Sequence, residues 1–292
     1  MIAKTIFLNE PDWMQLIINK IGSLSAQFSE KAPSLIVGIA GGSCTGKSTQ
    51  IAKKLCAQLP QHTQLLSQDN YQKGIELTNY FEYTYHWDDP ANFGIEEGRQ
   101  MLETLKSGKI AQMPVYSFER KKPVGYKKIQ STPVILFEGL YALHAHLKPL
   151  VDFSIYVESP LYGRLLRRVF RNAFDRYRQD PELVFERLLT GKVYESHRAE
   201  VVRQKENCDF TVHNPYCFSE TIHQFDLKPM TSEILHDVLY IYALNNDFYL
   251  KVVKDKSDQM WLIITDTEHM YSKFSIKSSS LDQLKKLDLD EM

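Results

Sequence analysis

The segment that most constrains this chain is residues 41 to 48, which read GGSCTGKS and fit the pattern G-x-x-x-x-G-K-[ST] at every position. In such a segment the glycines allow a tight turn that points several backbone N–H groups inward, toward an oligophosphate. Lys47 brings a positive charge to the phosphates, and the Ser48 hydroxyl can bind Mg²⁺. The segment therefore predicts a phosphate-binding loop, called the phosphate loop below.

The flanks of the phosphate loop supply the required context. Residues 34–40 form an apolar run of strand length, and residues 49–59 carry apolar side chains four apart, at Ile51, Leu55 and Leu59. That spacing is typical of a helix. Strand, glycine loop and helix is the order that a phosphate loop needs, whereas the alternative, a chance glycine-rich turn, does not require it.

Composition excludes several classes of protein. Of 292 residues, 43% are hydrophobic and 24% are charged, so the chain can bury a core. The net charge of −1 gives no general attraction to nucleic acid or to an anionic membrane. No apolar run approaches the roughly 18 residues of a membrane-spanning helix, and the first residues do not resemble a secretory leader. We expect a cytoplasmic protein without nucleic-acid or membrane partners.

The four cysteines are Cys44, Cys56, Cys208 and Cys217, and none forms a C-x-x-C pair. Neither a zinc site nor a disulfide framework is indicated, and free thiols suit a reducing cytosol. Cys44 lies inside the phosphate loop. It is either a small residue that fits there or a redox switch that blocks ATP.

Short apolar strands alternate with helices along the first 225 residues. Including residues 34–40, the predicted strands are 34–40, 63–67, 133–139, 152–157 and 209–213. Besides the helix after the phosphate loop, the predicted helices are 11–30, 95–106 and 161–177. This alternation predicts an α/β fold of the P-loop NTPase type, a mostly parallel five-stranded sheet with helices on both faces. Residues 114–132, rich in proline and lysine, are interpreted as a hairpin or a long loop.

Two carboxylates are expected beside the phosphate loop, because Asp69 follows one predicted strand and Glu138 ends another. Ligands of such sheets bind at the carboxyl ends of the strands. Phosphoryl transfer to an alcohol needs a carboxylate that accepts the hydroxyl proton, and Asp69 is the candidate; the alternative is a turn aspartate. Glu138 is the candidate for holding Mg²⁺ with Ser48; the alternative is a glutamate that merely ends a strand.

Two residues of the segment between these strands are candidates for contacts with a substrate. Asp88 can hydrogen-bond sugar hydroxyls, or it can simply begin a turn before Pro90. Tyr116 can contact a planar or sugar ligand, or it can only pack against its neighbours.

Arginines crowd one face of the predicted helix 161–177. At positions i, i+3, i+4 and i+7 stand Arg164, Arg167, Arg168 and Arg171. Like charges on one face repel one another unless anions meet them. A solvated face is one explanation, and a lid that clamps phosphates is the one we favour beside a phosphate loop. Arg176 and Arg178 extend this basic cluster.

Six segments together, in order and spacing, resemble the uridine kinase and phosphoribulokinase family of P-loop kinases. They are GIAGGSCTGKST (38–49), SQDNY (67–71), WDDPANF (87–93), PVYSF (114–118), LFEG (136–139) and RLLRRVFR (164–171). The resemblance covers roughly residues 34 to 215. It implies ATP- or GTP-dependent phosphorylation of the 5′-hydroxyl of uridine or cytidine, with Mg²⁺ as the metal.

The resemblance also implies a set of site residues. Asp69 would be the base, with Lys47 and Arg168 as the other catalytic residues, and Ser48 and Glu138 would serve the metal. The nucleotide-binding residues would be Gly41, Gly42, Ser43, Cys44, Thr45, Gly46, Lys47, Ser48, Thr49 and Arg164. The substrate-binding residues would be Asp69, Tyr71, Asp88, Tyr116, Arg171 and Arg176.

Departures from the family pattern concern the acceptor. Ser117 stands where uridine kinases usually have aspartate, Gln72 replaces a frequent tyrosine, and residues 119–122 lack the histidine that usually helps to recognise the base. The lid reads Arg171-Asn172 where the family usually has R-D. The acceptor therefore stays open between a pyrimidine nucleoside and another alcohol. The basic stretch 120–122 would suit a sugar phosphate, as in phosphoribulokinase.

The predicted domains are a P-loop kinase domain, residues 1–225, and a C-terminal appendage, residues 226–292. The kinase domain would include a substrate insertion at 70–130 and an arginine-rich lid at 160–180. The appendage has three predicted β segments, 247–254, 259–266 and 270–276, and could serve packing, homo-oligomerisation or partner binding. In the remaining alternative, a non-catalytic nucleotide-binding regulator, Asp69 would have no purpose.

Overall fold

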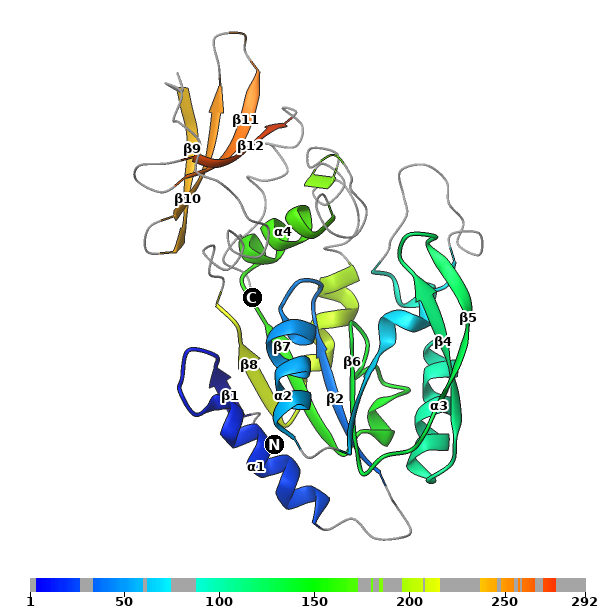
Figure 1. The fold of residues 1–292 in the computed structure, drawn as a ribbon. Coiled ribbons are helices and arrows are strands. Elements are labelled where there is room, and N and C mark those ends of the chain that lie inside the picture. The colour runs from blue at the N-terminus through cyan, green and yellow to red at the C-terminus, as the bar shows by residue number, and fades with distance from the viewer. Residues whose placement is uncertain are drawn as a thin grey trace. The chain divides into compact units, whose positions relative to one another are not determined.

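A computed structural model of the chain describes residues 4–26, 34–59, 62–74, 88–172, 180, 184–185, 196–206, 208–215, 237–245, 248–254, 257, 259–265 and 270–276 (Figure 1). The chain divides into two compact units. The first comprises Met1–Glu158 and Lys192–Asn214, and the second comprises Ser159–Gly191 and Pro215–Met292. This division falls inside the predicted kinase domain; the domain limits 1–225 and 226–292 stay a prediction.

The first unit is built on a six-stranded sheet in the order β1-β8-β7-β2-β6-β3, in which every neighbouring pair is parallel. The strands are β1 (Lys4–Phe7), β2 (Leu35–Gly41), β3 (Thr63–Ser67), β6 (Val134–Gly139), β7 (Phe153–Glu158) and β8 (Phe210–His213). The predicted parallel sheet and its five strands are confirmed. The predicted strand number was one too few, because β1 is a four-residue edge strand with a single buried side chain and carries almost no apolar signal.

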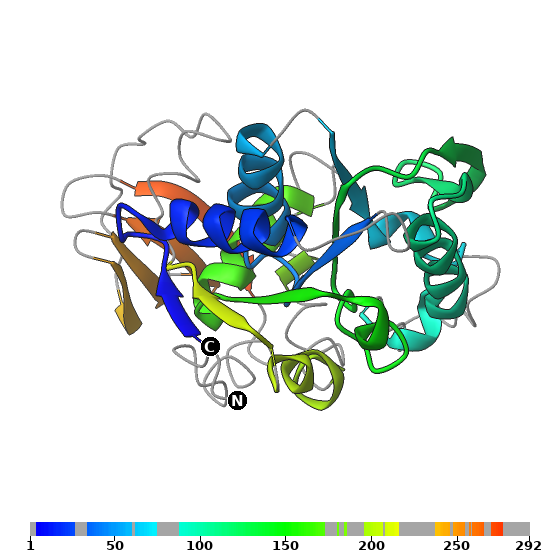
Figure 2. The ribbon, with the colours of Figure 1, turned by 90° about the horizontal axis from the view of Figure 1, so that it is seen from below.

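Helices cover both faces of this sheet. On one face lie α1 (Trp13–Ser25) and the helical segment Lys47–Ala52, which continues into α2 (Lys53–Gln58). On the other lie α3 (Ile95–Lys106) and the helical segment His197–Lys205. Figure 2 shows α1 and α2 (blue) on one side of the sheet and residues 197–205 (yellow-green) on the other. The helix predicted at 95–106 is confirmed to the residue, whereas α1 is shorter than the predicted 11–30 in the described part of the chain.

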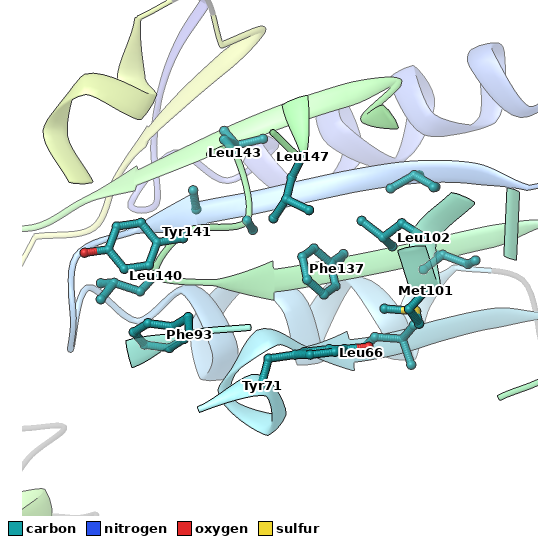
Figure 3. Packing of buried hydrophobic residues seen from close by; sticks show 14 of the residues in the cluster. Leu66, Tyr71, Phe93, Met101, Leu102, Phe137, Leu140, Tyr141, Leu143 and Leu147 are labelled. Atoms are coloured by element: carbon teal, nitrogen blue, oxygen red, sulfur yellow. The ribbon is translucent and has the colours of Figure 1, made fainter. Parts of the chain in front are cut away.

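Alternate side chains of the central strands point to opposite faces of the sheet and pack into two separate hydrophobic cores. Leu35, Val37 and Ile39 of β2 pack with α1 and α2, while Ile36 and Ala40 face α3. All residues of β2, β6 and β7 are buried, as expected of central strands in a parallel sheet covered on both faces. Figure 3 shows Phe137 of β6 in the middle of the second core, among Tyr141, Leu147 and Met101.

The predicted hairpin at 114–132 is confirmed as an antiparallel pair, β4 (Ala111–Ser117) and β5 (Lys122–Ile129). Ala111, Met113 and Ile129 bury its inner side in the core that contains Phe137. The outer side of β5 is exposed, with Tyr126 at 68% relative exposure.

The second unit contains α4 (Leu161–Phe170) and an antiparallel sheet in the order β12-β11-β10-β9. Its strands are β9 (Asp237–Asn245), β10 (Phe248–Lys254), β11 (Met260–Thr265) and β12 (Met270–Ile276). Three of them confirm the predicted β segments, and β9 was not predicted. Within the described part of the chain, no helix has the length and apolar character to cross a membrane.

We predict that Phe137→Ala lowers the free energy of unfolding by about 3–5 kcal/mol, because Phe137 is fully buried and its removal leaves a cavity. The matched aromatic control Tyr126→Ala, on the exposed side of β5, should cost less than about 0.5 kcal/mol. Urea unfolding of the two variants measures both changes. Equal losses would show that this core does not carry the stability we assign to it.

Candidate active site

The phosphate loop leaves the carboxyl end of β2 between its two neighbouring strands. Gly41 has φ +152°, and a Cβ there would lie 2.4 Å from the backbone oxygen of Val157 on β7, so no side chain fits. The Thr45 hydroxyl donates to the Gly42 carbonyl at 2.9 Å, and Lys47 Nζ lies 3.4 Å from the same oxygen. The loop is thus a tight turn, as predicted from its sequence, and its lysine contacts the Gly42 carbonyl of the same loop.

Ser48, in the helical segment Lys47–Ala52, contacts Glu138 near the end of β6. The Ser48 hydroxyl donates to Glu138 Oε2 at 2.8 Å, and Glu138 is paired in register with Ile39 of β2 and Ser67 of β3. Two oxygen donors beside a phosphate loop fit Mg²⁺, which is usually held by one or two carboxylates together with substrate phosphates and water. Among the described residues, no group of three or more His, Cys, Asp or Glu side chains offers a competing metal site.

Glu138 is buried, with 5% relative exposure, and its chemistry depends on that burial. Burial raises the pKa of the Glu138 carboxyl; the positive charge of Lys47 lowers it, and the Asp69 carboxylate raises it again. Hydrogen bonds with the Ser67 and Ser48 hydroxyls lower the pKa further. The net direction is upward, so the folded protein holds this carboxylate against a desolvation cost that a bound cation would offset.

Asp69 lies in the single helical turn Gln68–Tyr71, directly after β3. The Ser67 hydroxyl accepts a hydrogen bond from the Asp69 backbone N–H at 3.3 Å and so caps this turn. Ser67, two residues before Asp69, is paired in register with Glu138, so the turn that carries Asp69 begins beside the end of β6. The structure therefore brings Lys47, Ser48, Glu138 and Asp69 together at the carboxyl edge of the sheet, as the sequence predicted.

Asp88 is connected to this edge through Tyr141. The Tyr141 hydroxyl donates to the Asp88 carbonyl, and Asp88 is buried, with 8% relative exposure. The Tyr141 backbone N–H in turn donates to Gln68 Oε1 at 2.7 Å. A Cβ at Gly139 would lie 2.3 Å from Gln68 Cβ, so that glycine makes room for the glutamine.

Tyr71 and Tyr116 are both buried in the first unit. Figure 3 shows the Tyr71 side chain directed toward Leu66 and Met101, inside the core. Burial raises the pKa of Tyr71. The Tyr116 backbone N–H donates to Asn70 Oδ1 at 3.2 Å, which connects β4 to the segment that carries Asp69. Contacts of Tyr71, Tyr116 and Asp88 with a substrate stay predictions.

The arginines of the predicted lid belong to the second unit. The predicted helix 161–177 is confirmed over α4, whereas residues 173–177 lie outside the described residues. In α4, Arg164 is buried and Arg167 donates to the Ser159 hydroxyl at 3.2 Å. The actions of Arg164, Arg168 and Arg171 on a nucleotide or substrate stay predictions. Arg176 lies outside the described residues. Of the loop residues, Ser43 and Cys44 are half-buried and Thr49 is exposed.

Sequence reasoning missed the buried amides that hold this edge together: Gln68, Gln204 and Asn214. Gln204 Oε1 accepts from the Leu143 backbone N–H at 3.0 Å, and its Nε2 donates to the Leu140 carbonyl at 2.8 Å. Gln68 and Asn214 each directly follow a strand, as polar residues often do, and Gln204 stands among charged residues, so no local pattern marks the three amides.

We predict that Glu138→Gln is more stable than wild type at neutral pH when no metal is present. A raised folded-state pKa means that Glu138 stabilises the protein below its unfolded value of about 4.3, and that this stability is lost as pH rises through the folded pKa. Gln carries no charge and avoids that loss. Urea unfolding in EDTA from pH 4.5 to 7.5 measures the difference, with exposed Glu10→Gln as the control. A variant less stable than wild type at pH 7.5 would contradict the stated balance of burial and pairing.

Parts of the chain are similar in sequence to known proteins. The chain is 29% identical over 184 residues to the inorganic pyrophosphatase TTM2 of Arabidopsis thaliana, covering 62% of this chain but 26% of that one. It is 32% identical over 159 residues to the uridine kinase of Borrelia hermsii, covering 54% of this chain and 76% of that one. The chain thus spans about a quarter of the length of the first of these relatives.

A solved structure shares the fold. The putative fructose transport system kinase from Silicibacter sp. TM1040 matches with a TM-score of 0.54 at 17% identity, over 69% of this chain and 98% of that one. The sequence profile described as "Phosphoribulokinase / Uridine kinase family" matches residues 36–216, more than half of the chain. This chain therefore belongs to the phosphoribulokinase and uridine kinase family.

Proposed function

We propose that this protein transfers the γ-phosphoryl group of ATP to the 5′-hydroxyl of uridine or cytidine, with Mg²⁺. The observation that supports this proposal best is the convergence of Ser48, Glu138 and Asp69 beside Lys47, with Ser48 Oγ 2.8 Å from Glu138 Oε2. The choice of acceptor is supported by relatives that are named uridine kinase or uridine/cytidine kinase.

In this proposal each residue has one task. The backbone of the phosphate loop binds the oligophosphate, and Lys47 offsets charge on the transferred group. Ser48 and Glu138 would hold Mg²⁺, which when bound neutralises charge on the β- and γ-phosphates. Asp69 accepts the proton of the acceptor hydroxyl and aligns its oxygen with the phosphorus. The action of the α4 arginines, including Arg168, on the transferred group stays a prediction.

A phosphorylated acceptor is the second candidate, and one contact favours it. A Cβ on Gly74 would lie 3.1 Å from Lys122 Cβ, so the basic turn of the β4–β5 hairpin adjoins the segment that follows Asp69. The Arg120 backbone N–H donates to the Ser117 hydroxyl at 3.1 Å, which orders this turn. In this second candidate, the phosphate group of a sugar phosphate binds to the basic side chains of Arg120, Lys121 and Lys122.

Several finer expectations stay predictions beside this proposal. They are GTP as an alternative donor, a homo-oligomeric state, a cytoplasmic location and a regulatory role for Cys44. Among the described residues, Cys44, Cys56 and Cys208 take part in no disulfide bond.

We predict that Asp69→Asn lowers kcat by about 10²- to 10⁴-fold while the Kd for ATP changes less than about twofold, because the amide cannot accept the proton. Steady-state kinetics and ATP titration separate the two effects. Asp12→Asn, an exposed aspartate before α1, serves as the matched control. Wild-type turnover in Asp69→Asn would remove Asp69 from the role of base.

ADP release with ATP and Mg²⁺ tests the acceptor across uridine, cytidine, purine nucleosides and ribulose 5-phosphate. We predict turnover with uridine and cytidine.

We further predict that Lys47→Ala lowers both ATP affinity and kcat by about tenfold or more, because the variant loses a charge-assisted contact to phosphate. Lys53→Ala, which changes an exposed lysine six residues further along the chain, should match wild type. In the ADP-release assay, turnover with ribulose 5-phosphate alone would replace uridine and cytidine by a sugar phosphate as the proposed acceptor.

A further inference from the structure

Asn214, the residue after β8, bonds to the phosphate loop from a distant part of the chain. Its side-chain Nδ2 donates to the Thr45 carbonyl at 2.7 Å. Its own backbone N–H donates to the Glu158 carbonyl at the end of β7, at 2.8 Å. Asn214 is buried, with 6% relative exposure, so this amide replaces water that the Thr45 carbonyl would otherwise bind.

The contact between Asn214 and Thr45 leaves no room for a side chain at the next residue, Gly46. A Cβ on Gly46 would lie 2.3 Å from Asn214 Nδ2, and Gly46 has φ +88°. The asparagine amide therefore lies directly against the Thr45–Gly46 peptide. Both the left-handed backbone and the missing side chain of Gly46 are needed for this approach.

The segment that carries Asn214 is itself held firmly. Glu158 is buried, and its Oε1 lies 2.5 Å from Lys205 Nζ, while its Oε2 lies 3.2 Å from Nδ1 of His213, the residue before Asn214. The Phe7 ring stacks on the His213 ring with centroids 4.9 Å apart. Strands β1, β7 and β8 and the segment that ends at Lys205 therefore all fix the position from which Asn214 reaches the loop.

The direction of one loop N–H follows from this bond. In a trans peptide the C=O and the following N–H point to opposite sides, and the chain has no cis peptide bond among the described residues. Because the Thr45 carbonyl points at Asn214, the Gly46 N–H points away from Asn214. An inward N–H at this position is what a phosphate cradle requires.

We propose that Asn214 is a positioning residue that fixes the Thr45–Gly46 peptide and thereby sets the affinity of the phosphate loop for nucleotide. This inference rests on the proposed use of ATP. Asn214 acts through the loop backbone, so its loss changes ATP binding without changing the KM for the acceptor.

Asn214→Asp is the sharpest test because it keeps the shape and replaces the donor by an acceptor that faces the Thr45 carbonyl. We expect amide hydrogen exchange of residues 41–48 to become about tenfold faster in the ligand-free protein, and ATP to bind about tenfold more weakly at pH 7.5. The ATP defect relative to wild type should shrink as pH falls toward 5, because a protonated aspartate donates again. A defect without pH dependence would overturn the hydrogen-bond role.

Asn214→Ser, which keeps a shorter donor, provides a second variant should Asn214→Asp fail to fold; we expect an intermediate defect. Asn19→Asp, the same change at an exposed amide of α1, is the matched control and should alter neither measurement. Unchanged loop exchange and unchanged ATP affinity in folded Asn214 variants would overturn the inference. Wild-type protein that binds no ATP would instead contradict the proposed function, and loop exchange would still decide whether Asn214 orders the loop.

Discussion

The parallel pairing of β2 with β6 on one side and β7 on the other determines the rest of the candidate site. It places Gly41 against the Val157 carbonyl and brings Ser48 within 2.8 Å of Glu138. A loop that leaves a central strand in this way is bounded by both neighbours, and its backbone has little freedom left. The protein accepts a buried carboxylate at this point, with a raised pKa, which is a cost to stability that functional sites often carry.

Buried amides extend this rigidity to the residues around the loop. Gln68 connects the turn that carries Asp69 to Tyr141, whose hydroxyl bonds to the Asp88 carbonyl. Asn70 connects the same turn to Tyr116. The proposed base and two proposed substrate contacts are therefore fixed to one another by hydrogen bonds that are independent of any ligand. Such preorganisation is what phosphoryl transfer demands, because its catalysis consists mainly of positioning and charge stabilisation.

The elements with strong periodicity were predictable and those set by long-range pairing were not. α3, with its buried face Met101, Leu102 and Leu105, matched its predicted range, and the apolar runs of β2 and β6 named the central strands. β1 escaped because one inward residue in four gives no pattern, and its strand exists only through pairing with β8.

The same division holds for the site. Lys47, Ser48, Glu138 and Asp69 could be named because motif and strand end coincide, and the structure brings them together. Asn214 could not, because its partner Thr45 is 169 residues away and nothing local marks the pairing. Tyr71 stands in a segment that resembles the family, yet its side chain packs into the core beside Leu66. Motif membership thus predicted which segments lie at the site, whereas the direction of the Tyr71 side chain depends on core packing that the motif does not encode.

The central claim is that the carboxyl edge of the first sheet carries the transfer of the γ-phosphoryl group from ATP to the 5′-hydroxyl of uridine or cytidine. Phosphorus NMR of ATP, Mg²⁺ and uridine with catalytic protein tests it most directly, since it distinguishes a new phosphate ester from free phosphate. We predict that a phosphomonoester signal of uridine grows as the γ-phosphate signal declines, and that Lys47→Ala abolishes both changes. An unchanged ATP spectrum, or conversion of ATP to inorganic phosphate alone, would contradict the account.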